Sequence, residues 1–231
     1  YLAEAVRRLK RYFASIALEM FPMDEADYSV LIRAGADSLT VYQEVYDRGI
    51  YGKVHPRGKK ADYDWRLLTP ERGGRAGFRA LNIGTLFGLG EPRSEAFMAG
   101  LQALFLERQF PHVEISLSLP RMTRAGGGIP PRYPLSDKGL VQFMLAWRLC
   151  MPRLGINMST REPADLRDRL IHLGVTRISA GSRTDVGGYM VRPRKAQAQF
   201  DVTDIRSVEQ VAAMIRKSGY QPVFKDWEMP V

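Results

Sequence analysis

Short runs of β-forming residues alternate along the chain with longer segments in which apolar residues recur at helical spacing. This spacing, with capping residues and helix-ending Gly or Pro, predicts helices at 1–13, 24–32, 62–76, 94–109, 136–150, 163–173 and 208–217. The β-forming runs predict strands at 16–22, 38–42, 81–89, 113–119, 155–159 and 177–180, and a short last strand at 222–224. The pattern is that of about six successive strand–helix units.

Such units build a parallel sheet, either closed as a (β/α)8 barrel or open and doubly wound. Polar or unusual residues follow the ends of several strands, which favours the barrel, because its strand ends converge on one site. The first helix is already under way at Tyr1, and six units are two fewer than a full barrel requires. We therefore expect residues 1–231 to form one partial TIM-type barrel domain, with strands three to eight and a C-terminal helix, and the other units to lie upstream.

The faces of the predicted helices indicate which residues fill the core. Met and aromatic stripes, including Phe97, Leu101, Leu104 and Phe105 on one face of the helix at 94–109, are expected to be core. Cys150, late in an amphipathic helix, is expected to be a buried small apolar residue.

The composition is globular, with 45% apolar and 26% charged residues. The single cysteine excludes a disulfide framework and any iron–sulfur site made by this chain alone. The three histidines, His55, His112 and His172, lack the spacing of metal ligands and are expected on the surface. No secretory leader and no apolar run long enough for a membrane span occurs.

The charge is positive: 34 Lys and Arg residues against 25 Asp and Glu residues give a net charge of +9. The basic residues are scattered, and their densest group, at 53–60, is expected in a loop. A soluble basic surface explains this charge, and so does an anionic partner, either a small molecule or a polymer.

Two segments near the C-terminus carry candidate ligand-binding chemistry. Arg161 lies directly after an apolar strand, where it would either clamp a carboxylate or brace the rim through Glu162. The next strand leads into a Gly-rich segment with Ser179 and Ser182, which would either receive an anion on its N–H groups or form an ordinary turn.

Two further segments carry weaker signals. Gln43 and Glu44 end a strand and would bind a ribose or make rim hydrogen bonds. The glycines at 126–128, a short distance after Arg121, are typical of a mobile loop over the mouth or of a plain connector.

Seven strings, taken in order, resemble one enzyme family over nearly the whole chain. They are TVYQEVY (40–46), GKKADYDWR (58–66), IGTLFGL (83–89), SLPR (118–121), STRE (159–162), SAGS (179–182) and KDW (225–227). The family is 2-iminoacetate synthase, the radical S-adenosylmethionine (SAM) tyrosine lyase of thiamine biosynthesis.

The resemblance implies a radical SAM (β/α)8 barrel in the cytoplasm. A [4Fe–4S] cluster on a CxxxCxxC loop reduces SAM, and the radical formed splits L-tyrosine at Cα–Cβ into 2-iminoacetate and p-cresol. It further implies thiazole synthase and a reducing flavodoxin or ferredoxin as partners, with no nucleic acid and no membrane. This chain has no CxxxCxxC, so the cluster ligands are expected upstream of Tyr1, no metal ligand is expected within the chain, and the chain alone is expected to be inactive.

The matching strings also imply site residues. Gln43 and Glu44 would contact the SAM ribose and amino groups, Arg66 its carboxylate, and the strand with Gly84 and Leu86 its adenine.

On the substrate side, Arg161 would hold the tyrosine carboxylate, assisted by Ser179 or Ser182, and Arg121 would lie beside them. The acid or base residue of the reaction stays unassigned.

Two other functions fit the sequence. The hydrogenase-maturation tyrosine lyase, which further degrades the product to CO and cyanide, shares the SAGS and DYDxR strings. Its Cys-rich C-terminal extension weighs against this alternative, because no cysteine follows Cys150, unless the chain is cut at its C-terminus as well. A non-catalytic basic barrel that binds an anion is the second alternative.

Overall fold

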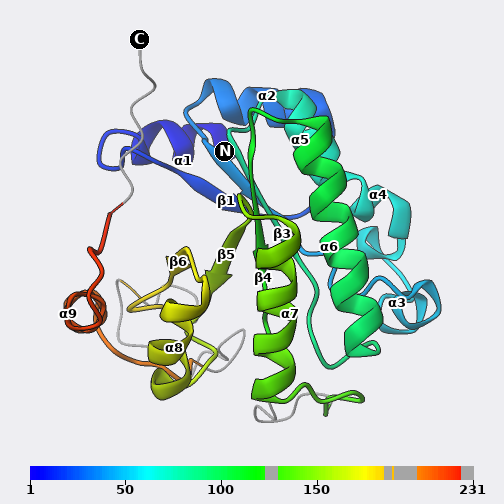
Figure 1. Ribbon diagram of the computed structural model, residues 1–231. Helices are drawn as coiled ribbons and strands as arrows, with labels where there is room; N and C mark the ends of the chain where they lie inside the picture. The colour runs from blue at the N-terminus through cyan, green and yellow to red at the C-terminus, as the bar shows by residue number, and fades with distance from the viewer. Residues whose placement is uncertain (123–129, 185–188, 190–201, 225–231) are drawn as a thin grey trace.

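Six short parallel strands form one sheet in the order β1-β2-β3-β4-β5-β6 (Figure 1). The computed structural model describes residues 1–122, 130–184, 189 and 202–224. The strands are β1 (Ala17–Glu19), β2 (Ser38–Thr40), β3 (Ala80–Gly84), β4 (Glu114–Ser118), β5 (Gly155–Met158) and β6 (Arg177–Ile178). Because every strand pairs in parallel with the next one in the sequence, the described sheet is an α/β half-barrel.

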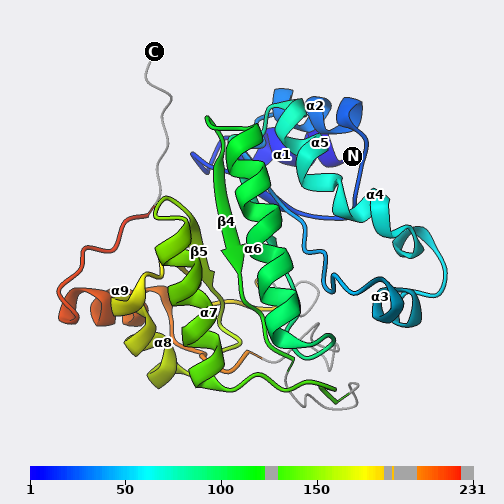
Figure 2. The same ribbon diagram turned by 45° about the vertical axis from the view of Figure 1, so that its right-hand side comes forward.

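Helices cover the outer face of this sheet, and α6 and α7 lie side by side in both views (Figures 1 and 2). The α-helices are α1 (Leu2–Leu9), α2 (Glu25–Arg33), α3 (Arg48–Val54), α4 (Tyr63–Leu67), α5 (Thr69–Ala76), α6 (Pro92–Gln109), α7 (Asp137–Cys150), α8 (Ala164–Leu170) and α9 (Val208–Lys217). Short 3-10 turns lie at η1 (Lys59–Ala61) and η2 (Ile171–Leu173). Within the described ranges, no helix combines the length and apolarity that a bilayer span requires.

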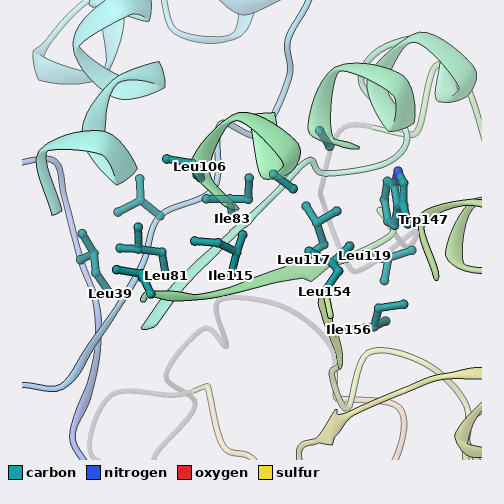
Figure 3. Packing of buried hydrophobic residues seen from close by; sticks show 14 of the residues in the cluster. Leu39, Leu81, Ile83, Leu106, Ile115, Leu117, Leu119, Trp147, Leu154 and Ile156 are labelled. Carbon is teal, nitrogen blue, oxygen red and sulfur yellow. The ribbon is translucent and has the colours of Figure 1, made fainter. Parts of the chain in front are cut away.

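The core lies between the strands and these helices (Figure 3). Alternate strand residues point toward the helices, and all of them are apolar and buried: Leu39, Leu81, Ile83, Ile115, Leu117 and Ile156. Leu106 of α6 and Trp147 of α7 pack over them. Each such side chain contributes about 1.5–3 kcal/mol when removed from water, so this layer sets the register of the sheet.

Capping residues begin and end the helices close to the predicted positions. The Asp24 carboxylate accepts a hydrogen bond from the Asp27 N–H at 2.9 Å, and Ser136 accepts one from Gly139 at 3.2 Å. Ser207 and Gln210 form a reciprocal capping box at α9. Each cap satisfies a backbone donor that has no partner within the helix, which is why the sequence predicted these boundaries well.

Several predicted elements were wrong in detail, and one is the helix expected at 1–13, which ends at Leu9. The helix expected at 62–76 is two helices, because the chain breaks at Leu68 and Pro70 is tolerated only in the first turn of α5. The basic segment 53–60 is not all loop, since Lys53 and Val54 end α3 and η1 begins at Lys59. Residues 222–224 form no strand.

The outward face of α6 is also a correction. Phe97 is 68% exposed, and Leu101 and Phe105 are exposed beside it, while Leu104 is only partly buried. The buried face carries small residues instead, since a Cβ on Gly100 would lie 2.7 Å from Trp147 Nε1. Close packing of α6 against α7 therefore selects the small residues for the interior and leaves the large ones outside.

Cys150 was expected to be buried, and it is exposed at the last position of α7. Its neighbour Leu149 is 82% exposed, while Trp147 in the same turn is buried, so Leu149 and Cys150 lie on the solvent-facing side of that turn.

Gly84→Ala tests the close approach of β3 to β4. A Cβ at Gly84 would lie 2.5 Å from the Ser118 carbonyl oxygen, so we expect the free energy of unfolding to fall by about 1–3 kcal/mol. The matched control is Gly52→Ala in α3, where a Cβ meets nothing within 4 Å. That change should raise the free energy of unfolding by up to about 1 kcal/mol, because alanine has a higher helix propensity than glycine. Urea unfolding measures both, and equal effects would contradict the packing described.

Candidate functional site

The inner face of the half-barrel is polar. Residues that alternate with the buried core positions carry hydroxyl and amide groups: Thr40, Tyr42, Asn82, Ser116, Ser118 and Asn157. We call this face the lumen. The sequence analysis did not identify it as a site, although polar residues at every second position of four successive short strands were a usable signal.

Hydrogen bonds across the strands join these lumen residues. Asn82 Nδ2 donates to Ser118 Oγ at 3.0 Å and to Tyr42 OH at 3.3 Å. Ser116 Oγ donates to Asn82 Oδ1 at 3.2 Å and accepts from Asn157 Nδ2 at 3.2 Å. Burial raises the pKa of the Tyr42 hydroxyl above its ordinary value, so Tyr42 is a neutral hydrogen-bonding group at physiological pH.

Glu44 is the centre of a charged cluster at the carboxyl end of β2. Its carboxylate lies 2.9 Å from Lys60 Nζ, 2.9 Å from an Arg66 guanidinium nitrogen and 2.9 Å from His55 Nε2. Desolvation raises the pKa of this carboxyl, but the Lys60 hydrogen bond and the charges of Arg66, Lys60 and His55 outweigh it and hold the pKa low. Glu44 is thus an anion under all ordinary conditions.

The backbone of Glu44 is itself unusual. Its φ of 72° lies in the left-handed region, and it is the one non-glycine residue with positive φ in the described ranges. Its carbonyl accepts a hydrogen bond from Leu86 N–H at 2.7 Å, and Glu44 forms a parallel bridge with Thr85. A residue held in this region is over-determined by its surroundings, here by the three side chains that bind its carboxylate.

Of the predicted cofactor residues, the structure brings Glu44 and Arg66 together and separates Gln43 from them. Arg66 Nε donates to the Tyr42 carbonyl at 2.7 Å, and another nitrogen of the same guanidinium donates to the Glu44 carboxylate. Gln43 alternates with Tyr42, is 2% exposed, and has no hydrogen-bond partner on either amide atom. His55 was expected on the surface, but its side chain is 13% exposed against Glu44, so that expectation was wrong.

A buried carboxylate, Glu95 of α6, secures the segment that follows Glu44. It accepts hydrogen bonds from the N–H groups of Tyr46 at 2.8 Å and Asp47 at 3.1 Å, and from Thr85 Oγ1 at 2.8 Å. Thr85 Oγ1 also lies 2.8 Å from the Glu44 carbonyl. Desolvation raises the pKa of Glu95, and the backbone donors oppose that rise. Through these bonds, Glu95 anchors the loop after Glu44 to helix α6.

Arg161 lies after β5, at the same end of the lumen. Burial lowers the pKa of its guanidinium, while Tyr42, Glu19 and Glu162 oppose that change through their charges. The charges of these three groups therefore act on Arg161. Among the described residues, the hydrogen bonds of the Glu162 carboxylate go to Arg121.

Arg121 is saturated by its own chain. Its Nε donates to Glu162 at 2.9 Å, and Nη1 donates to Asp137 at 2.7 Å and to the Leu135 carbonyl at 3.0 Å. It therefore joins the segment after β4 to the segment after β5 and to the start of α7. The three glycines at 126–128 lie outside the described residues.

The segment after β6 is held by a buried arginine. Arg167 is fully buried and donates to Asp204 and to the Ser179 carbonyl. Arg206 bonds Asp204 in turn, and its carbonyl accepts from Gly181 N–H at 3.1 Å. Ser179 and the half-buried Ser182 are thereby fixed at the same end of the sheet as Arg161.

Comparison with known proteins agrees with this geometry. The family model described as "Biotin and Thiamin Synthesis associated domain" matches residues 118–221. The 2-iminoacetate synthase of Escherichia coli (strain K12) is 38% identical over 99% of this chain. The chain spans 60% of the length of that relative. The resemblance drawn from the sequence motifs is therefore confirmed.

Solved structures share the fold. The structure of HydG, a maturase of the [FeFe]-hydrogenase, matches with a TM-score of 0.86 and 29% identity, covering 95% of this chain and 49% of that chain. Methylornithine synthase (PylB) matches with a TM-score of 0.68 and 18% identity, over 96% of this chain and 63% of its own. The predicted radical SAM type of α/β half-barrel is thus confirmed for the six described strands.

Asp204 should make stability depend on acid pH. Its pKa is lowered from 3.8 to about 2 in the folded protein, since hydrogen bonds from Arg206 and the charge of Arg167 outweigh desolvation. A lowered folded-state pKa gives stability that is present above the unfolded pKa and is lost as pH falls through the folded one. We expect about 2 kcal/mol to be lost between about pH 4 and pH 2. Urea unfolding of the wild type and Asp204→Asn across that range measures it, because the variant should lack this component.

Glu95→Gln tests the buried anchor. A glutamine keeps one acceptor oxygen and presents an NH2 group to a backbone donor, so one N–H loses its partner. We expect a loss of about 1–3 kcal/mol in the free energy of unfolding. Glu91→Gln at the exposed start of the same helix is the control, with an expected loss below about 1 kcal/mol. Similar losses for both variants would show that Glu95 does not secure the loop.

Proposed function

We propose that this relative of the 2-iminoacetate synthases forms the SAM- and substrate-binding wall of a radical SAM lyase that splits L-tyrosine at Cα–Cβ. The products would be 2-iminoacetate and p-cresol, which together contain every atom of tyrosine. The observation that carries the proposal is the convergence of Glu44, Arg66 and Arg161 at one end of a polar lumen. The identity of 38% along 99% of the chain supports it.

The described residues do not fit a [4Fe–4S] cluster. No group of three or more His, Cys, Asp or Glu side chains in the described ranges is placed to hold a metal, and Cys150 lies exposed on the outer helix α7. We propose that the six strands correspond to strands three to eight of a barrel whose other strands supply that cluster.

The residues around Glu44 fit SAM better. A permanently ionised carboxylate can accept from a ribose diol or an ammonium group, and Arg66 supplies the guanidinium that a carboxylate requires. Gln43, Gly84 and Leu86 stay predictions for this cofactor. Gln43 is 2% exposed. SAM, acting with the cluster, supplies the radical chemistry of the family.

On the substrate side, this chain's own task is to bind and orient. Arg161 would bind the tyrosine carboxylate, and Ser179 or Ser182 would add a hydrogen bond from the segment held by Arg167. Arg121 is committed to Glu162 and Asp137, so its contribution would be to hold the rim in place.

The same proposal includes partners and location. 2-Iminoacetate would pass to thiazole synthase, a flavodoxin or ferredoxin would supply electrons, and the cytoplasm would be the compartment. These follow from the resemblance to a family of thiamine biosynthesis rather than from the geometry of this chain.

A hydrogenase-maturation type of tyrosine lyase is the second candidate, favoured by the TM-score of 0.86 to HydG. The higher identity to 2-iminoacetate synthase, 38% against 29%, favours the first. The two differ in product, because only the second enzyme carries the cleavage on to CO and cyanide. Product analysis of the loaded enzyme therefore separates them.

Arg161→Ala tests the proposal at its substrate end. Loss of a charged, geometrically matched partner for the carboxylate should abolish measurable L-tyrosine binding in a calorimetric titration. Arg108→Ala, an exposed arginine on α6, is the control and should leave the affinity unchanged. Equal tyrosine affinity in the wild type and Arg161→Ala would refute the assignment of Arg161.

A further inference from the structure

Resting on the proposed function, we infer that Glu19 binds the ammonium group of the amino acid whose carboxylate Arg161 binds. The two side chains would then recognise the two ends of a zwitterion. This makes the site specific for a free α-amino acid rather than for an aromatic compound in general.

The position of Glu19 in the sheet places it on the lumen. It is the last residue of β1, in register with Thr40, which in turn is in register with Asn82. Its neighbour Leu18 packs against the hydrophobic core. Since successive strand residues point to opposite faces, Glu19 points into the lumen, at the end where the carboxyl termini of all six strands meet.

Glu19 and Arg161 share that end. The charge of each acts on the other, and both act on Tyr42, which is itself a lumen residue, so the three groups lie within electrostatic reach of one another at this end of the lumen. An α-amino acid carries its opposite charges two bonds apart, and a carboxylate and a guanidinium facing one space complement it.

The bonding of the neighbouring carboxylates singles out Glu19. Glu44 is held by Lys60, Arg66 and His55, Glu95 by backbone and hydroxyl donors, and Glu162 by Arg121. For Glu19, no hydrogen bond or ion pair is found within the described ranges. Of these four carboxylates, Glu19 is therefore the one that makes no hydrogen bond or ion pair with another described residue.

The alternative to a ligand-binding role is that Glu19 is a solvated acid at the edge of the sheet and binds nothing. Two observations favour the ligand-binding role. The residue is exposed as a whole, yet desolvation by the groups around its carboxyl raises the pKa of Glu19. Its charge also opposes that of the arginine which the proposal assigns to the substrate carboxylate.

Three ligands test the inference, each lacking a different charge. L-Tyrosine has both groups, tyramine lacks the carboxylate, and 3-(4-hydroxyphenyl)propanoate lacks the ammonium. Calorimetric titration of the 231-residue chain with each should show Glu19→Gln binding L-tyrosine and tyramine roughly 10- to 100-fold more weakly. The affinity for 3-(4-hydroxyphenyl)propanoate should be unchanged or improved. Glu19→Asp should restore part of the tyrosine affinity, and Glu25→Gln on exposed α2 should match the wild type.

The outcomes separate the two claims. If the wild type binds L-tyrosine and Glu19→Gln weakens all three ligands equally, or none, the role of Glu19 is overturned while the proposed substrate stands. If the wild type binds no L-tyrosine, the proposed function fails and the role of Glu19 fails with it. Arg161→Ala provides the mirror image, because it should spare tyramine and lose 3-(4-hydroxyphenyl)propanoate.

Discussion

The burial of alternate strand residues beneath α5, α6 and α7 is the constraint from which the rest of the molecule follows. Leu39, Leu81, Ile83 and their neighbours leave water only if they all face the helices. A shift of one residue in any strand would exchange the two faces. The apolar layer therefore decides that Thr40, Asn82 and Ser116 face the lumen, and so places the polar site as well.

The site is held before any ligand arrives. Glu95 fixes the loop after β2, and Arg167 fixes the segment after β6, each from a buried position in the helix layer. Glu95 accepts from backbone N–H groups of one loop and Arg167 donates to a backbone carbonyl of the other, so a shift of either loop would leave a buried charge with fewer partners. Such preorganisation reduces the entropy that binding would otherwise cost.

The sequence predicted the fold better than it predicted the site. Strand and helix positions followed from periodicity, and Asp24 and Ser136 marked helix starts because capping is a local interaction. The Glu44–His55 contact joins a strand end to a helix end, and nothing in the spacing of the two residues indicates it.

The prediction of which face of α6 is buried was wrong for a related reason. Periodicity shows that a helix has two faces, but which face is buried depends on how closely the neighbours approach, and Trp147 over Gly100 requires small residues inside. Glu19 escaped notice because the predicted strand at 16–22 is an apolar run with no alternation, so its one acid does not mark a face. In both cases the deciding partner comes from a distant part of the chain.

The strictly sequential strand order has a consequence for how the molecule folds and opens. Each strand–helix unit pairs only with the units before and after it in the sequence, as repeats do in a solenoid, so stability is close to a sum of unit and nearest-neighbour terms. Partial opening then proceeds inward from the two edge strands. Hydrogen exchange should be fastest in the two-residue β6 and the three-residue β1, and slowest in the five-residue pair β3 and β4 at the centre. Glu19 lies on β1 and Arg161 follows β5, so a ligand bound by both would join units that the sheet itself does not pair.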